Sequence, residues 1–344
     1  MAVLLPSKEQ LISAGKIVYD AMPATPQYSW PLINQALETE VWIKHENHTP
    51  TGAFKMRGGL VYLHALAQRA PEIKHVVSAT RGNHGLSVGF AAQRHGMIAH
   101  IVVPRGNSSE KNAAMRALGV DVIEFGDEFQ DCREHAAKLA KANDWHMIPS
   151  MHRDLLAGVA SYWMELFTAQ PDLDVVFVPI GQGSGICAAA AAKQALGLKT
   201  KIIGVVSAHA LAYKSSFEAG CKLEAPVSTK LADGLACRVP DDVSLEIIMS
   251  SVEKIIAVTD TEVAAAMKLL FTATHNVAEG AGAAALAGAL QLKEGLKGLK
   301  VGLPLCGGNV DAKQFSIIIG AWNFASDATQ AKTQQFSFAG QRFI

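Results

Sequence analysis

Residues 49–58 read T-P-T-G-A-F-K-M-R-G and place a lysine, Lys55, among small and apolar residues. Lysines are rarely buried unless they are paired or functional, yet Lys55 stands between Phe54 and Met56. The run V-W-I-K at 41–44 predicts a strand before this stretch, and apolar residues at helical spacing predict a helix after it. A solvated lysine at the end of a helix is the alternative interpretation.

The composition is typical of a well-buried globular enzyme. Of 344 residues, 49% are hydrophobic and 18% are charged, and 31 basic side chains balance 31 acidic ones. This length favours two lobes, and the balanced charge argues against nucleic-acid or membrane partners. We expect no signal peptide and no membrane span. Five scattered cysteines without C-x-x-C spacing argue against disulfides and zinc, and they predict a cytoplasmic location.

Strand and helix patterns alternate along most of the chain. We expect a first series of strands at 75–79, 100–103, 121–125 and 145–148, and a second series at 175–180, 201–206, 254–258 and 301–305. The second series includes continuous apolar strands, which are typical of sheets buried on both faces. The prediction is an α/β fold of two lobes, each with a mostly parallel sheet flanked by helices.

Three junctions between a strand and a helix carry polar or small residues. G-Q-G-S-G at 181–185 predicts a phosphate site of backbone N–H groups at a helix start. It lacks the G-x-G-x-x-G spacing and the later acidic residue of a dinucleotide site, and a plain tight turn is the alternative. T-R-G-N-H-G at 80–85 suits a carboxylate or phenolic oxygen, or else simple helix capping. Cys306 ends the last strand, where ligands sit in open α/β sheets, although a lone cysteine is often only filler.

Together these motifs resemble one family. A-F-K, T-R-G-N-H-G, G-Q-G-S-G and C-G-G-N occur in the order seen in fold-type II pyridoxal-phosphate (PLP) enzymes, and most resemble the serine/threonine dehydratase and serine racemase group. The likeness runs from about residue 25 to residue 311. It implies the fold of the tryptophan synthase β subunit, with a large PLP-binding domain (1–73 and 152–328), a small domain (74–151) and a C-terminal tail (329–344).

The resemblance implies a role for each matching residue. Lys55 would form the Schiff base with pyridoxal 5'-phosphate and act as the catalytic base, because burial lowers the pKa of an amine. The other residues of the cofactor site would be Phe54 against the ring, Asn83 on the ring oxygen, Gly181, Gln182, Gly183, Ser184 and Gly185 on the phosphate, Gly234 and Glu279 along the other edge, and Cys306 at the pyridine nitrogen. The substrate carboxylate would meet Thr80, Asn83 and His84.

Two departures from the family pattern refine the expected activity. Racemases of this group carry a serine directly before G-N-H, and the chain has Arg81 there, which cannot shuttle a proton. Arg81 could instead pair with a second substrate carboxylate, or it could be purely structural. The usual acidic metal ligands are replaced by Val206 and Ala212, so we expect no metal.

The expected function is therefore that of a PLP-dependent lyase. It would eliminate water from a small-molecule 3-hydroxy-L-amino acid, giving a 2-oxo acid and ammonia. Serine, threonine, 3-hydroxyaspartate and 3-phenylserine remain candidate substrates. The alternatives are an amino-acid racemase or synthase that uses the same cofactor, and a PLP-binding protein without turnover. We expect a homodimer.

Overall fold

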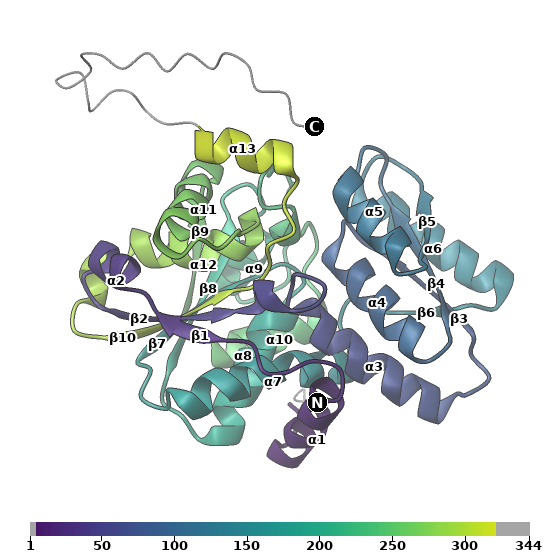
Figure 1. Ribbon diagram of the computed structural model, residues 1–344, viewed down its shortest axis with the longest axis horizontal. Helices are drawn as coiled ribbons and strands as arrows, with labels where there is room; N and C mark the ends of the chain where they lie inside the picture. The colour runs from purple at the N-terminus through teal and green to yellow at the C-terminus, as the bar shows by residue number, and fades with distance from the viewer. Residues whose placement is uncertain (1–4, 321–344) are drawn as a thin grey trace, which may run out of the picture.

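The computed structural model describes residues 5–320 and contains two sheets, one in each lobe (Figure 1). The larger sheet has six strands in the order β1-β2-β10-β7-β8-β9, and the smaller has four in the order β5-β4-β3-β6. Every pairing between neighbouring strands is parallel except that of β1 with β2. The predicted α/β fold class is confirmed. The strands are β1 (Gln27–Ser29), β2 (Glu40–His45), β3 (His75–Ala79), β4 (Ile98–Val103), β5 (Asp121–Glu124), β6 (His146–Met147), β7 (Val175–Pro179), β8 (Lys201–Ser207), β9 (Lys254–Val258) and β10 (Lys300–Leu305).

Helices cover both sheets, and Figure 1 shows the smaller lobe, with α4 to α6, beside the larger one. The described helices are α1 (Lys8–Tyr19), α2 (Pro31–Leu37), α3 (Lys55–Arg69), α4 (Asn83–Arg94), α5 (Ser109–Ala117), α6 (Phe129–Asn143), α7 (Arg153–Ala169), α8 (Ser184–Leu196), α9 (Ala212–Ala219), α10 (Asp242–Ser251), α11 (Asp260–Thr274), α12 (Gly280–Gln291) and α13 (Ala312–Gly320). Short 3₁₀ turns occur at η1 (Glu46–His48), η2 (Asp233–Leu235) and η3 (Lys293–Leu296). The sequence pattern did not predict α2, α9, α10 and α13. The exact domain boundaries stay a prediction, and the expected tail at 329–344 lies outside the described residues.

Helix α3 joins the two lobes because it packs against α4 of the smaller lobe and α7 of the larger one. The close approach depends on glycines. A Cβ on Gly59 would lie 2.3 Å from Ser87 Oγ of α4, and one on Gly158 of α7 would lie 2.2 Å from the carbonyl oxygen of Arg57. Because real Cβ atoms do not make contacts this short, only glycine allows the three helices to meet here. The segment that begins with Lys55 is thus held on both sides.

A buried cluster of charged residues fixes the first turn of α3. Arg57 and Glu46 have fully buried side chains (0% exposed), and Arg57 Nε lies 2.7 Å from Glu46 Oε2. Arg57 Nη1 lies 2.6 Å from Glu165 Oε1 of α7, and Lys44 Nζ of β2 lies 2.5 Å from Glu165 Oε2. Two cations therefore face two anions, and the Thr25 hydroxyl donates to Glu46. The cluster links β2, η1, α3 and α7 where Lys55 leaves the loop.

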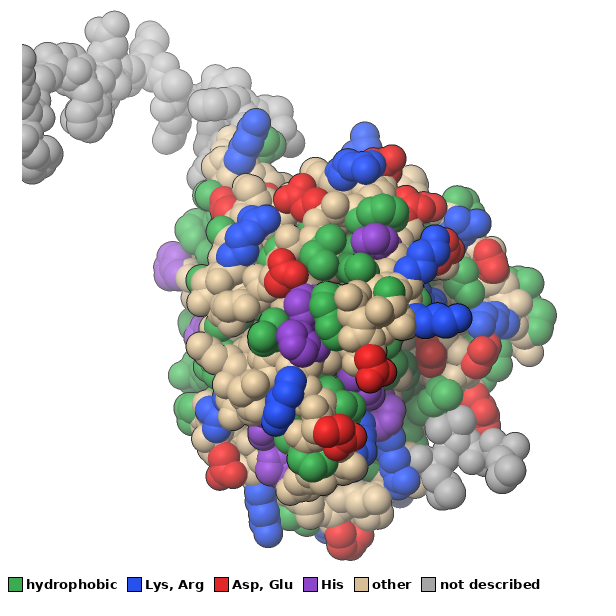
Figure 2. Space-filling view, turned by 90° about the vertical axis from the view of Figure 1, so that its right-hand side faces the viewer, with side chains coloured by type: hydrophobic (Ala, Val, Ile, Leu, Met, Phe, Trp, Pro, Cys, Tyr) green, Lys and Arg blue, Asp and Glu red, His purple; other side chains and the backbone are tan. Residues whose placement is uncertain are grey.

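The surface shows no single-sign stripe on the face that carries the smaller lobe. Figure 2 shows blue and red side chains interspersed there, as the balanced composition predicts. Within residues 5–320, no helix combines the length and the apolar character needed to cross a bilayer.

Replacing Arg57 by Met should lower the free energy of unfolding by about 3–5 kcal/mol, because Glu46 and Glu165 would stay buried without their partner. Urea unfolding monitored by circular dichroism measures this change. Arg69→Met is the matched control, since Arg69 pairs with Asp154 at the surface and should cost at most about 1 kcal/mol. Equal effects of the two substitutions would contradict the structural importance of the cluster.

Candidate functional site

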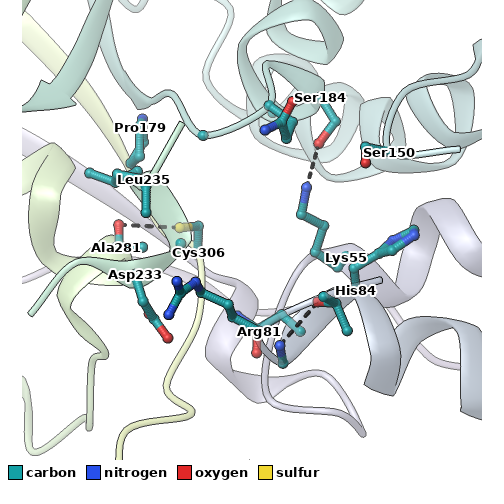
Figure 3. Close-up of a pocket in the computed structure, with 18 of the residues that line it drawn as sticks. Lys55, Arg81, His84, Ser150, Pro179, Ser184, Asp233, Leu235, Ala281 and Cys306 are labelled. Atoms are coloured by element: carbon teal, nitrogen blue, oxygen red, sulfur yellow. Dashed lines mark hydrogen bonds between the residues drawn. The ribbon is translucent and has the colours of Figure 1, made fainter. Parts of the chain in front are cut away.

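One cavity lies where the carboxyl ends of strands from both sheets face each other. Its walls come from the loops that follow β3, β7 and β10, from the start of α3, and from the Asp233 turn (Figure 3). Every predicted site residue lines this cavity: Phe54, Lys55, Thr80, Arg81, Asn83, His84, Gly181, Gln182, Gly183, Ser184, Gly185, Gly234, Glu279 and Cys306. The structure therefore brings the four sequence motifs together. The individual roles of these residues stay predictions.

Lys55 is positioned by backbone contacts with the end of the last strand. Ala53 forms an antiparallel bridge with Gly307, and the Phe54 N–H donates to the carbonyl of Cys306 at 3.1 Å. The Lys55 side chain then points across the cavity, and its Nζ donates to Ser184 Oγ at 2.8 Å (Figure 3). Burial lowers the pKa of Lys55 to about 8. Near physiological pH the neutral form of this amine is therefore a minor fraction, but a far larger one than for a lysine of ordinary pKa, and it is the form that a base or nucleophile requires.

The loop 181–185 presents unpaired backbone donors to the cavity. Within residues 5–320, no group accepts a hydrogen bond from the N–H groups of these five residues. The carbonyl of Gln182 is turned away and accepts from Tyr213 Oη (3.1 Å) and Ser244 Oγ (2.9 Å). A Cβ on Gly181 would lie 2.2 Å from the Gly234 carbonyl oxygen, so the close packing requires glycine. Free N–H groups at the start of α8 form a site suited to a phosphate.

The side-chain amide of Asn83 is held in one orientation. Its Nδ2 donates to Glu279 Oε1 at 2.5 Å, and its Oδ1 accepts from Asn309 Nδ2 at 2.8 Å. The Glu279 carboxylate can only accept a hydrogen bond, and the Asn309 NH₂ group can only donate one. The nitrogen and oxygen of the Asn83 side chain therefore cannot be interchanged. One N–H of Asn83 stays available for a ligand oxygen.

The loop after β3 offers further donors. Among the described residues, nothing accepts from the N–H groups of Arg81, Asn83, His84 and Gly85. Burial lowers the pKa of His84 to about 3, so its ring is neutral, and its buried Nε2 has no partner within residues 5–320. These groups fit a substrate carboxylate. Thr80 Oγ1 instead accepts from the Gly82 N–H at 3.0 Å, which shapes the turn.

Arg81 extends its guanidinium into the cavity on the side of Asp233 and Cys306 (Figure 3). In the part of the chain that the structure describes, it makes no hydrogen bond and no ion pair. A structural arginine would be expected to bond nearby carbonyls or an acid. This arginine is therefore available to a ligand.

Cys306 lines the same cavity, directly after β10. Its Sγ lies 3.5 Å from the carbonyl oxygen of Ala281, to which the thiol can donate, and burial raises the pKa of the thiol well above its usual range. Cys306 is thus a neutral group. Phe54 packs edge-on against Tyr162, with ring centroids 6.0 Å apart, and forms one wall.

Sequence reasoning missed two charged residues of the cavity, Lys111 and Asp233. Lys111 Nζ lies 3.2 Å from Asp233 Oδ2 and 3.4 Å from Glu279 Oε2. The partners are more than 100 positions apart in the chain, and Lys111 follows a serine-rich helix start that looks like a surface segment. No local pattern could have identified it.

The donor set fits pyridoxal phosphate. The cavity combines five free N–H groups for a phosphate, an oriented amide for a ring oxygen, a neutral thiol, and a lysine of lowered pKa. Within residues 5–320, no cluster of three or more His, Cys, Asp or Glu side chains could hold a metal ion.

Comparisons with known proteins agree with this geometry. The family model described as "Pyridoxal-phosphate dependent enzyme" matches residues 18–307. The L-threonine ammonia-lyase of Thermotoga maritima is 32% identical over 84% of this chain and 72% of that protein. The L-threo-3-hydroxyaspartate ammonia-lyase of Saccharomyces cerevisiae is 29% identical over 92% of this chain and 97% of that protein. The structure of maize serine racemase superposes with a TM-score of 0.85 at 26% identity, covering 90% of this chain and 96% of that one.

The lowered pKa of Lys55 can be tested in the cofactor-free protein. Only the neutral amine reacts with acetic anhydride, so labelling of Lys55 should reach half its maximum at about pH 8. Lysines of ordinary pKa, about 10.4, should be labelled only at higher pH. Competitive labelling with mass spectrometry gives both titrations in one sample. A midpoint for Lys55 that coincides with that of the exposed lysines would contradict the assignment.

Proposed function

The chain belongs to the family of pyridoxal-phosphate dependent enzymes, and we propose that it is an ammonia-lyase that eliminates water from a 3-hydroxy-L-amino acid. The products would be a 2-oxo acid and ammonia. The observation that carries this proposal is the position of Lys55, an amine of lowered pKa that faces a set of unpaired anion donors in one cavity.

Different residues of this chain would bind the substrate and transfer its proton. Pyridoxal phosphate, when bound, supplies an electron sink that makes the Cα–H bond of the substrate acidic. The N–H groups around Asn83 and His84 would hold the substrate carboxylate. Lys55 Nζ would accept the Cα proton, and the Cβ–O bond would break as the departing hydroxyl takes up one proton, so that Cα–H and Cβ–OH together give water. The enamine that is released would react with water to give the 2-oxo acid and ammonia.

The charges of the cavity favour elimination over racemisation. Racemisation needs a second group that delivers a proton to the face of Cα opposite the base. Arg81 stands at the position where related racemases carry a serine, and a guanidinium keeps its proton. Lys111 is ion-paired with Asp233 and Glu279, which raise its pKa above the usual range. Neither cation can shuttle a proton near neutral pH.

Arg81 also bears on the choice among 3-hydroxy amino acids. It has no acidic partner within residues 5–320, and its guanidinium lies in the cavity. A second carboxylate on the substrate would supply that partner through a bidentate pair. Of the candidate substrates, this favours 3-hydroxyaspartate, and one relative of 29% identity bears that activity in its name.

The homodimer, the cytoplasmic location and the metal independence are further proposals. Val206 and Ala212, at the positions of the family's acidic metal ligands, are buried apolar residues with 1% and 0% exposure. Activity that survives exhaustive chelation would support the last of these proposals.

Lys55→Ala should abolish turnover while the protein stays folded. We expect a loss on the order of 10²–10⁴-fold or more, because the proposed catalytic base is removed. Formation of 2-oxo acid and ammonia should be measured with serine, threonine, 3-hydroxyaspartate and 3-phenylserine, and Lys74→Ala at the surface serves as the control. Retained turnover in Lys55→Ala would overturn the mechanism. Failure of the unmodified protein to turn over any of the four substrates would favour a PLP-binding protein without turnover.

Arg81→Met should discriminate between substrates. The loss of one charged pair predicts a decrease in kcat/KM of about 10- to 100-fold for 3-hydroxyaspartate, and little change for threonine, which lacks a second carboxylate. Arg105→Met is the control, because Arg105 is exposed and pairs with Asp127 at the surface. Equal losses for the two substrates would show that Arg81 has only a structural role.

A further inference from the structure

Lys111 connects the two lobes at the edge of the cavity. It belongs to α5 of the smaller lobe, whereas Asp233 and Glu279, which its Nζ contacts at 3.2 and 3.4 Å, belong to the larger lobe. The lysine is only 8% exposed although it carries a charge. Two further contacts between the lobes lie beside it, from Ser108 to Asp311 and from the Ala312 N–H to Glu110. We call this set of contacts between the two lobes, beside the cavity, the bridge.

The bridge is continuous with the loop that carries Asn83. Glu279 uses its other oxygen, Oε1, to accept from Asn83 Nδ2 at 2.5 Å. The stem of Lys111 also supports this loop directly, because a Cβ on Gly82 would lie 2.5 Å from Lys111 Cδ. The position of Lys111 therefore affects the Asn83 amide both through Glu279 and through the backbone of the loop.

We propose that Lys111 is a positioning residue that couples closure of the two lobes to the orientation of the Asn83 amide, and so to the affinity for the cofactor. Lys111 keeps Glu279 in the acceptor form that fixes Asn83 with an N–H toward the cavity. The inference uses the geometry of the cofactor site and does not depend on the proposed substrate or reaction.

The charges around Glu279 explain why a cation is needed. The titratable groups that face its carboxyl are Lys111 from α5, Asp233 from η2 and the thiol of Cys306 after β10. Burial raises the pKa of Glu279, the charge of Asp233 raises it further, and Lys111 alone lowers it among these three groups. Without Lys111, the pKa of Glu279 would rise further, and Glu279 would bind a proton more readily as the pH is lowered. A Glu279 that is protonated on Oε1 would donate a hydrogen bond toward Asn83, whose carbonyl oxygen would then turn to meet it. The N–H for the ligand would be lost.

The test compares Lys111→Met with Lys111→Arg, and uses Lys138→Met on the exposed face of α6 as the control. The dissociation constant of pyridoxal phosphate is measured by absorbance titration of the cofactor-free proteins. We expect Lys111→Met to weaken binding about tenfold or more, as for the loss of one charge-assisted hydrogen bond. Lys111→Arg should retain most of the affinity, and Lys138→Met all of it. Unchanged affinity in Lys111→Met would overturn the proposal.

Two further measurements separate positioning from a merely structural role. In Lys111→Met the affinity should fall further as the pH is lowered, because Glu279 becomes protonated. Adding Glu279→Gln should remove this pH dependence, since glutamine does not titrate but can still accept from Asn83. Hydrogen exchange should also become faster at residues 82–85 and 233–235 together in Lys111→Met. A loss of affinity with the same pH profile as the unmodified protein would contradict the role assigned to Glu279.

If Lys111→Met does not fold, Asp233→Asn probes the same bridge from the larger lobe, where the Asp233 side chain is 36% exposed. Faster exchange at residues 82–85 in this variant would support the coupling, because Lys111 lies between Asp233 and that loop. Exchange confined to residues 233–235 would overturn it.

Discussion

The buried pairing of Arg57 with Glu46 and Glu165 is the constraint on which the site depends. Buried ion pairs add little net stability, because the cost of desolvating the charges offsets their attraction, but an unpaired charge is strongly unfavourable. The pairing therefore adds little to the free energy of folding, but it disfavours alternative folded arrangements in which one of these charges is unpaired. A shift of α3 along the chain would leave at least one of these buried charges without a partner. The pairing therefore favours the arrangement in which Arg57 faces both acids, and this arrangement directs Lys55, two residues earlier, into the cavity.

The cavity itself follows from the topology. Loops at the carboxyl ends of parallel strands collect donors because helix starts lie there with unpaired N–H groups. Here two such sheets face each other, so that the loop at 181–185 belongs to one lobe and the loop at 80–85 to the other. A ligand with anionic groups at two ends would be held by both lobes at once. Binding of such a ligand would then stabilise this arrangement of the two lobes.

The sequence alone was sufficient to identify site residues whose signal lies in a short continuous motif. The stretch 49–58 and the loops at strand ends carry their signal within a few residues, and the structure gathers all of them around one cavity. It failed where a role exists only through distant partners, as for Arg57 and Glu165, 108 positions apart, or for Lys111 and Asp233, 122 positions apart. Short helices such as α2 and α13 were missed because they have few buried positions, so no clear apolar period marks them.

The charges in the cavity bear on how Lys55 would act as the base in the proposed reaction. Lys55 has no ion pair among the described residues, and burial lowers its pKa to about 8, so it can exchange a proton. Lys111 has two acidic partners and keeps its proton. Arg81 keeps its proton because a guanidinium group is not deprotonated in proteins. Three cations thus share one cavity, but only one of them can act as a base. In the proposed mechanism Lys55 would exchange the proton, and neither Arg81 nor Lys111 would deliver one to the opposite face of Cα, as racemisation would need.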